Sequence, residues 1–304
     1  MRGIGLKVAS VGIFVIMSSL LKAAEGVPAG ELVFFRSFFA IFPIVLVLAW
    51  RGEFFDSLKT RDPVGHIIRG LVGVASMGFG FYGLTKLPLP ESVSISYASP
   101  LAVVVLSALL LKEHVRLYRW SAVLVGLVGV LIIMWPRLTI FSDGSQAGNE
   151  QLIGAISAFA GAICAAFAMI AVRRLVHTEK TTTIVIYFSL TSSVLALVTL
   201  PFGWVWPTWQ QAVLLIGAGF AGGIAQLLLT SSYRHADLSI IAPFEYTSMI
   251  LSIAVGYIVF GDVPTVQMLV GGLIVVGSGI FIIYRERQLG LDRSKARQAA
   301  TPQG

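Results

Sequence analysis

Two ionisable side chains fall inside long apolar stretches of this 304-residue chain. Arg36 lies four residues into the stretch 32–50, and Glu245 lies six residues into the stretch 239–260. A charge inside a membrane helix costs roughly 2.5–3.5 kcal/mol on insertion scales, so charges that are retained there commonly serve a function. We therefore treat Arg36 and Glu245 as candidates to bind a charged group of a solute or to carry a proton.

A structural role is the alternative for both residues. Arg36 could extend to the membrane surface or pair with Glu25 or Glu31. Glu245 could be a helix-end acid in a protein-lined crevice near Arg234. The sequence leaves both interpretations open.

Two tyrosines occupy similar segments 149 positions apart, Tyr97-Ala98-Ser99-Pro100 and Tyr246-Thr247-Ser248-Met249. Their rings could stack on a planar solute from opposite sides of a cavity while each hydroxyl hydrogen-bonds to it. Packing between helices is the alternative. Further polar candidates for substrate binding in the same layers are Ser99, Thr247, Ser248 and Gln226. Such side chains also form hydrogen bonds between helices.

Pro43 and Pro100 are expected within apolar helices. A proline removes one backbone hydrogen bond and exposes a carbonyl group, which can line a cavity or act as a hinge. A plain kink is the commoner outcome. Both prolines are candidate hinges.

The sequence contains no pattern typical of a catalytic, metal or cofactor site. The four histidines, His66, His114, His177 and His235, have no ligand spacing. The segment 217–222 fits a glycine pattern of dinucleotide-binding proteins, but it lies inside an apolar stretch with no strand before it, so helix packing explains it better. We expect no cofactor, no bound metal and no enzymatic activity.

Composition indicates a membrane protein. Hydrophobic residues make up 56% of the chain, charged residues make up 12%, and the mean hydropathy is +0.86. The net charge of +7 is attributed to loop lysines and arginines that orient the chain in a bilayer. No basic run is interleaved with aromatic residues, so nucleic acid is not an expected partner.

Ten apolar runs approach the roughly 20 residues that a helix needs to cross a hydrocarbon core. They are residues 6–24, 32–50, 66–84, 91–111, 118–135, 152–173, 181–200, 210–231, 239–260 and 264–284. The connections are short, so no soluble domain is expected between them. The polar segment 285–304 is predicted to be a disordered cytoplasmic tail.

An internal duplication relates the two halves of the chain, 6–135 and 152–284. It superposes Tyr97 on Tyr246 and Glu113 on Asp262. Each half holds five spans, an odd number, so the second half must enter the membrane with the opposite orientation. The sequence thus predicts an all-α membrane protein with ten transmembrane helices in two inverted five-helix repeats, an architecture typical of secondary transporters.

The distribution of basic residues predicts the orientation. Eighteen of the 22 lysines and arginines, Lys7 and Arg69 among them, fall on the side of the N-terminus in this topology. The other four are Lys22, Arg36, Lys86 and Arg137. By the positive-inside rule, both termini are expected in the cytoplasm, with Glu113 at the cytoplasmic face.

Several segments carry a resemblance to a known family. They are Phe34-Phe35-Arg36-Ser37, Tyr97-Ala98-Ser99-Pro100, Lys112-Glu113 and Ala242-Pro243-Phe244-Glu245-Tyr246-Thr247-Ser248. With the ten spans, they resemble the EamA-type drug/metabolite transporter superfamily over about residues 6–284. Its members handle amino acids, nucleosides, S-adenosylmethionine, riboflavin and other metabolites. One departure is Met249, where the second-half motif usually has a proline matching Pro100.

The resulting hypothesis is a multi-pass inner-membrane transporter that moves a small organic metabolite by alternating access. The scarcity of acids in the spans and the tyrosine pair favour a largely neutral planar solute, and relatives with similar second and ninth spans make riboflavin uptake the single best guess. Export of amino acids or other metabolites is the main alternative.

Two other classes fit less well. A membrane enzyme should cluster ionisable residues at one interface, and the acids Glu53, Asp56 and Asp62 form no such site. A non-transporting subunit should carry a sizeable loop or soluble module. The direction of transport, the coupling ion and the choice between monomer and homodimer stay open.

Overall fold

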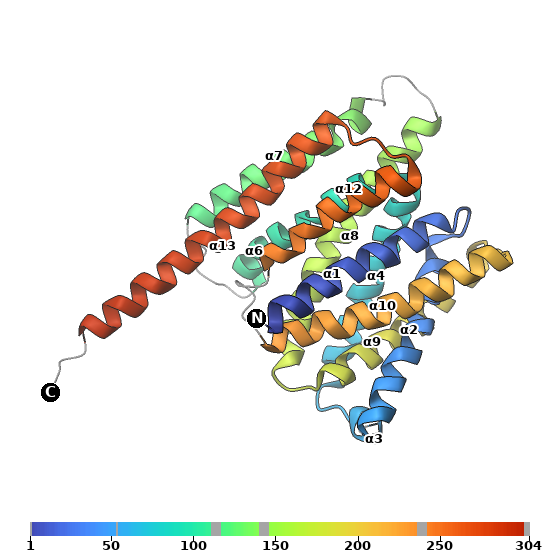
Figure 1. Cartoon of the computed structure of the whole chain (residues 1–304), viewed down its shortest axis with the longest axis horizontal. Coiled ribbons are helices and arrows are strands. Elements are labelled where there is room, and N and C mark those ends of the chain that lie inside the picture. Colours follow the sequence, from blue (N-terminus) through green and yellow to red (C-terminus); the bar gives the residue numbers. More distant parts are fainter. Residues whose placement is uncertain (1, 53, 111–116, 140–145, 236–241, 301–304) are drawn as a thin grey trace.

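The computed structural model describes residues 2–52, 54–110, 117–139, 146–235 and 242–300, and its regular elements within these ranges are all helices (Figure 1). The first half contains α1 (Arg2–Ala23), α2 (Ala29–Arg51), α3 (Phe54–Ser57), α4 (Pro63–Lys86), α5 (Leu89–Ser96), α6 (Ala98–Leu110) and α7 (Leu117–Thr139). The second half contains α8 (Gln146–Val176), α9 (Thr181–Leu197), η2 (Leu200–Phe202), α10 (Trp209–His235), η3 (Ala242–Tyr246), α12 (Thr247–Phe260) and α13 (Val266–Ala300).

Seven helical segments are long and apolar enough to cross a membrane, and three shorter apolar helices accompany them. The short ones are Trp120–Trp135, Thr181–Leu197 and Phe244–Phe260. Each of the ten predicted apolar runs overlaps one of these segments, so the all-α membrane fold is confirmed. Over the described residues 286–300 the predicted disorder is wrong, because α13 continues as a helix to Ala300.

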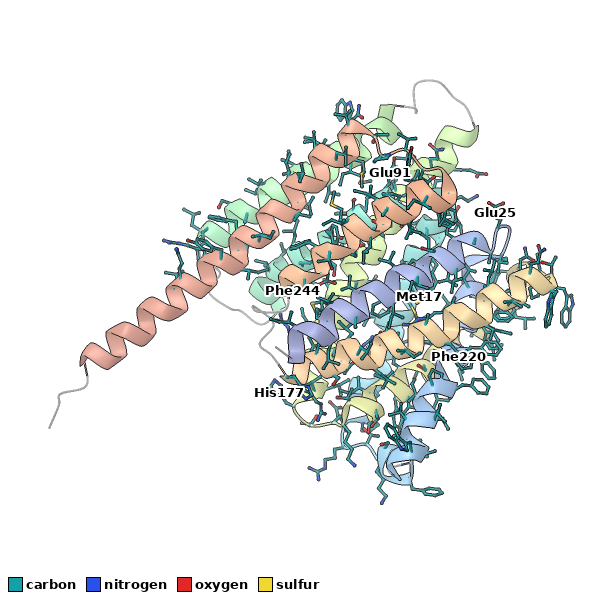
Figure 2. The ribbon with its side chains drawn as sticks, viewed as in Figure 1. Met17, Glu25, Glu91, His177, Phe220 and Phe244 are labelled. Atoms are coloured by element: carbon teal, nitrogen blue, oxygen red, sulfur yellow. The ribbon has the colours of Figure 1, made fainter. Side chains whose placement is uncertain are left out.

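The outer surface of the bundle is apolar and carries aromatic side chains. The ring of Phe220 on α10 stacks on Phe42 of α2, with the ring centroids 6.0 Å apart, and both residues are exposed (Figure 2). Trp50, near the end of α2, and Trp206 and Trp209, near the start of α10, are among the most exposed side chains. Tryptophans are enriched where a membrane protein meets the water interface, so this surface suits a bilayer.

The fourth and ninth apolar runs are interrupted at corresponding tyrosines. Tyr97 separates α5 from α6, and Tyr246 ends the 3-10 helix η3 where α12 begins. Pro100 has no N–H group to donate to the carbonyl of Ser96, which favours the first break. The second break occurs although Met249 stands in place of a proline, so the position of the break does not depend on that residue.

Several pairs of helices pack across the boundary between the two halves. α1 packs against α10, α4 against α8, α7 against α13, and α2 against both α9 and α10. The interface of α2 and α10 has no room for a side chain at Gly223, where a Cβ would lie 2.6 Å from the carbonyl oxygen of Ala40 and 2.8 Å from Pro43 Cγ. The segment 217–222 lies within α10, where a Cβ at Gly219 would overlap Phe39 and one at Gly222 would lie 2.9 Å from Met17 Sδ. These glycines therefore pack against α2 and α1. Pro43 sits inside α2 without ending that helix.

Candidate functional site

A partly open cavity of about 280 Å³ lies between helices of the bundle and is lined by both halves of the chain. α2 and α4 contribute two arginines, η3 contributes an acid, and α9 contributes an aromatic ring. The residues that matter for its chemistry are Arg36, Arg69, Ser76, Ser96, Ser99, Phe188, Gln226, Tyr233 and Glu245. Its volume lies just below the roughly 300–1,000 Å³ typical of ligand pockets, so in this conformation it suits part of a small organic molecule.

Arg36 points into this cavity. Its side chain is buried, and its Nη2 lies 3.5 Å from Oε1 of Gln226, at the outer limit of a hydrogen bond. Glu31, which was considered as a partner, instead accepts a hydrogen bond of 3.0 Å from the backbone N–H of Val205. Arg36 does not extend to the surface, and within the described residues it forms no ion pair with Glu25 or Glu31, so neither structural alternative matches this conformation.

Arg69 is a cavity residue that the sequence analysis missed. Its guanidinium carbon lies 3.8 Å from the centre of the Phe188 ring, and that of Arg36 lies 5.5 Å from the same centre. The sequence places Arg69 with the basic residues on the side of the N-terminus. The structure instead buries Arg69, which is only 7% exposed. The available signal was its place three residues into the run 66–84, close to the four residues by which Arg36 lies inside the run 32–50.

Glu245 reaches the cavity beside a lysine from the first helix. Its Oε2 lies 3.5 Å from Nζ of Lys7, a residue that is 2% exposed. The expected neighbour, Arg234, instead donates to the backbone carbonyl of Glu179. The sequence places Lys7 with the basic residues on the side of the N-terminus, whereas the structure buries its side chain between helices. Its partner could not be found from spacing, because the two residues are 238 positions apart.

The two tyrosines contact each other instead of facing each other across a cavity. Their ring centroids are 5.2 Å apart with the planes at 70°, and the hydroxyl of Tyr97 lies 2.5 Å from Oγ of Ser248. Neither tyrosine nor Ser248 lines the central cavity, whereas Ser99 and Gln226 do. In this conformation Tyr97, Tyr246 and Ser248 form a contact between the halves, and the candidate hinges Pro43 and Pro100 also lie outside the cavity.

A second ion pair lies at the other end of α1. Lys22 Nζ is 3.9 Å from Oδ2 of Asp262, the second residue after α12, and donates a 2.6 Å hydrogen bond to the carbonyl oxygen of Leu87. The same carboxylate oxygen accepts from the backbone N–H of Leu89 at 3.1 Å. α1 is thus tied to the η3–α12 segment at both ends. Glu113, the counterpart of Asp262, lies outside the described residues.

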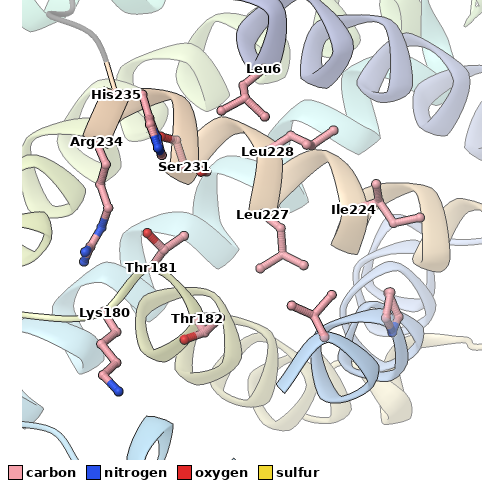
Figure 3. A pocket seen from close by; sticks show the side chains of 12 residues that line it. Leu6, Lys180, Thr181, Thr182, Ile224, Leu227, Leu228, Ser231, Arg234 and His235 are labelled. Atoms are coloured by element: carbon pink, nitrogen blue, oxygen red, sulfur yellow. The ribbon is translucent and has the colours of Figure 1, made fainter. Parts of the chain in front are cut away.

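A larger hollow of about 670 Å³ opens between α2, α9 and α10, with Leu6 of α1 on its rim (Figure 3). Its walls are largely aliphatic, and its polar groups, including Lys180 and Arg234, gather near the end of α10 (Figure 3). It contains none of the buried guanidinium groups. We place the candidate site in the smaller cavity, because buried unpaired charge is the stronger sign of function.

The fold and this site define a multi-pass membrane protein with a charged, solute-sized cavity between the two halves of the chain. The pattern of the EamA-like transporter family matches residues 1–135 and 152–285, and the chain belongs to that family. A pattern of solute carrier family 35 also matches residues 91–203.

Several characterised proteins are similar over most of their length. The S-adenosylmethionine uptake transporter of Rickettsia bellii is 27% identical over 93% of this chain and 97% of its own. The pseudopaline exporter CntI of Pseudomonas aeruginosa is 29% identical over 90% and 93%. The riboflavin transporter of Vibrio cholerae is 29% identical over 88% of each chain. These relatives identify a transporter, not an enzyme.

A solved crystal structure shares the fold. It superposes with a TM-score of 0.67 and covers 94% of this chain and 98% of its own, at 21% sequence identity. At that identity the likeness concerns the fold alone.

Proposed function

We propose that this chain is a secondary transporter of the inner membrane that carries a small organic metabolite by alternating access, with the central cavity as its solute site. The observation that carries the proposal is the cavity itself, which both halves line and which contains two buried guanidinium groups. Solute sites of secondary transporters lie between structural repeats near the middle of the membrane. Both termini are proposed to be cytoplasmic.

The packing of the helices supports an inverted repeat of ten spans. In the proposed duplication α1 corresponds to α8, α2 to α9, α4 to α10 and α7 to α13. Exchanging corresponding helices converts the contact of α1 with α10 into the contact of α8 with α4, and both are among the most extensive in the bundle. The contacts of α2 with α9 and of α7 with α13 are unchanged by the exchange. A pseudo-twofold axis predicts this pattern.

The two ion pairs of α1 are proposed to act as gates at opposite ends of the cavity. Lys7 pairs with Glu245, which lines the cavity, and Lys22 pairs with Asp262 near the other end of α1. Both pairs are formed here, so both gates would be closed in this conformation. Alternating access requires that one end opens while the other stays closed, and an ion pair that forms in one state biases that equilibrium. The contact of Tyr97 with Ser248 lies between the halves and would change during the same motion.

Riboflavin uptake remains the specific substrate proposal from the sequence, and export of an amino acid or another metabolite remains the alternative. The relatives differ in both solute and direction, being named for S-adenosylmethionine uptake, pseudopaline export and riboflavin transport. The first compounds to test are therefore riboflavin and S-adenosylmethionine.

Transport by the purified protein in liposomes tests the proposal. Labelled riboflavin and S-adenosylmethionine are supplied with an imposed proton or sodium gradient and without ATP, and liposomes without protein are the control. Uptake that exceeds the control and collapses when the gradient is dissipated supports secondary transport. Uptake that ignores every gradient contradicts coupling and leaves a facilitator.

A further inference from the structure

The central cavity contains two buried cations whose hydrogen-bonding groups are largely unused. Within the described residues, Nε and Nη1 of both Arg36 and Arg69 have no hydrogen-bond partner, and neither side chain forms an ion pair. The one hydrogen bond of Arg36, to Gln226, is long at 3.5 Å. Buried donors without acceptors are rare in folded proteins and call for an explanation.

Stacking on Phe188 accounts for part of the stability of these charges but not for the unused donors. Both guanidinium groups lie over the same ring, at 3.8 and 5.5 Å from its centre. A cation over an aromatic face is attracted to the ring, but its N–H groups at the edge stay free to bind an acceptor. Because the two cations share one ring, they also repel each other unless an anion lies between them.

The acid in the same cavity does not neutralise these arginines. Glu245 is the one acidic residue among the described residues that line the cavity, and its carboxylate lies 3.5 Å from the ammonium group of Lys7. The positive charge of Lys7 therefore offsets Glu245. The two guanidinium charges leave the cavity with an excess of positive charge.

The local sequence makes room for the second guanidinium group. Gly73 lies one helical turn after Arg69 on α4, and a Cβ at this position would overlap Nη1 of Arg69 and lie 2.5 Å from Phe188 Cε2. Any larger residue would displace the guanidinium group or the ring. Gly73 thus allows Arg69 to fold back over Phe188 into the cavity.

We propose that Arg36 and Arg69 form a subsite that binds an oxyanion of the solute, a carboxylate or a phosphate group, over the face of Phe188. This inference rests on the proposed function and names the chemical class of its substrate. Guanidinium groups bind such oxyanions through two parallel N–H donors, and a pair can enclose one anion from both sides. An oxyanion subsite disagrees with the largely neutral planar solute that the tyrosine pair favoured. It therefore argues against riboflavin, which has neither a carboxylate nor a phosphate group, and for a solute that has one, as S-adenosylmethionine does.

Three aromatic probes of similar size test the subsite without knowledge of the natural solute. They are benzoate, phenyl phosphate and the neutral benzamide, each added to the detergent-purified full chain at matched ionic strength. A ligand that binds the folded state raises its apparent Tm. We expect benzoate or phenyl phosphate to raise Tm by about 2–4 °C and benzamide to have no effect. Whether benzoate or phenyl phosphate raises Tm more distinguishes a carboxylate site from a phosphate site.

Two variants locate the effect. Arg36→Gln and Arg69→Gln should each abolish the shift, whereas Gly78→Ala, on α4 with open space around its Cβ, should keep it. Equal shifts by benzamide and by the anions overturn the subsite, as do anion shifts that persist in both arginine variants. If either variant fails to fold, the Tm shifts of the parent with the three probes still test whether the site prefers anions over neutral benzamide.

The transport assay separates this inference from the proposed function. Gradient-driven uptake of a metabolite, combined with equal Tm shifts by benzamide and the anions, keeps the transporter and rejects the subsite. An anion shift that depends on both arginines, combined with uptake that ignores every gradient, keeps the subsite and rejects secondary transport.

Discussion

Lys7 Nζ lies 3.5 Å from Glu245 Oε2, which joins the first helix of the chain to the segment that precedes α12. The contact bridges the two halves beside the central cavity, which Glu245 lines. Lys7 is 2% exposed, while the side chain of Glu245 is 35% exposed. The charge of Lys7 is therefore more dependent on the ion pair than the charge of Glu245, which water can also solvate.

This asymmetry predicts unequal effects of two substitutions. Glu245→Gln leaves a buried ammonium group without a counter-charge, so it should approach the roughly 3–5 kcal/mol that removing one partner of a buried pair costs. Lys7→Met leaves an acid that water reaches, so its cost should be smaller. Thermal unfolding of the purified variants measures both. A larger loss of stability in Lys7→Met than in Glu245→Gln would contradict the conclusion that Lys7 is the more buried partner.

Lys86→Met is the matched control for the lysine variant. Nζ of Lys86 lies 2.8 Å from Oε2 of Glu150, and these side chains are 30% and 61% exposed, respectively. Exposed ion pairs contribute about 0–1 kcal/mol, so this variant should unfold within a few degrees of the parent.

Gly73→Ala should weaken anion binding without removing either arginine. Its Cβ would overlap Nη1 of Arg69, and overpacking of this kind costs about 1–3 kcal/mol. Gly78→Ala on the same helix has no neighbour within 4 Å and should be neutral or stabilising by up to about 1 kcal/mol. The Tm shift with benzoate or phenyl phosphate, compared between the two variants, measures the difference. An unchanged shift in Gly73→Ala would show that Arg69 does not need this position.

The hydrogen bond between Tyr97 and Ser248 should contribute modestly to stability. Hydrogen bonds between membrane helices average about 0.6 kcal/mol in double-mutant cycles. Tyr97→Phe, Ser248→Ala and the double variant form such a cycle, and their coupling energy should be near that value. A coupling energy of zero would mean that the 2.5 Å contact does not stabilise this conformation.

Glu179, in the connection between α8 and α9, should make stability depend on pH. Burial alone would raise the pKa of this carboxyl group, but hydrogen bonds from the backbone N–H groups of Arg61 and Asp62 and the hydroxyl of Thr60 hold the pKa below its ordinary value. A lowered folded-state pKa stabilises the protein above the unfolded-state value of about 4.3, and this contribution is lost as the pH falls through the folded-state pKa.

Glu179→Gln tests this dependence, because glutamine keeps an acceptor oxygen but not the charge. The parent should be more stable than the variant at pH 7, by about 1–3 kcal/mol for hydrogen bonds to a charged group. The difference should shrink as the pH falls below about 4. A difference that stays constant down to pH 3 would contradict the lowered pKa.

The ten apolar segments could be predicted from sequence because hydropathy alone marks them, although only seven of the described helices also have the length to cross a bilayer. Four of the predicted site residues, Arg36, Ser99, Gln226 and Glu245, also meet in one cavity. Each has a polar group within an apolar run, which is a local signal.

The remaining site residues could not be predicted because their roles depend on helix rotation and on distant neighbours. Lys7 and Arg69 lie near the ends of their runs, where a basic side chain commonly reaches the surface, yet both turn inward. Tyr97 and Tyr246 occupy corresponding positions, but the separation of their rings is set by the packing of α5 against α12. The extension of α13 was missed because residues 285–300 are rich in charged and polar residues and show no apolar periodicity.

The most direct test of alternating access is the labelling of a single cysteine in the cavity. Ser99→Cys, in a Cys164→Ser background, is exposed to a membrane-impermeant maleimide in inside-out and right-side-out vesicles. We expect Glu245→Gln to raise labelling from the face that holds Lys7 and Asp262→Asn to raise it from the opposite face. Labelling that rises from the same face in both variants, or in neither, would contradict two gates around one cavity.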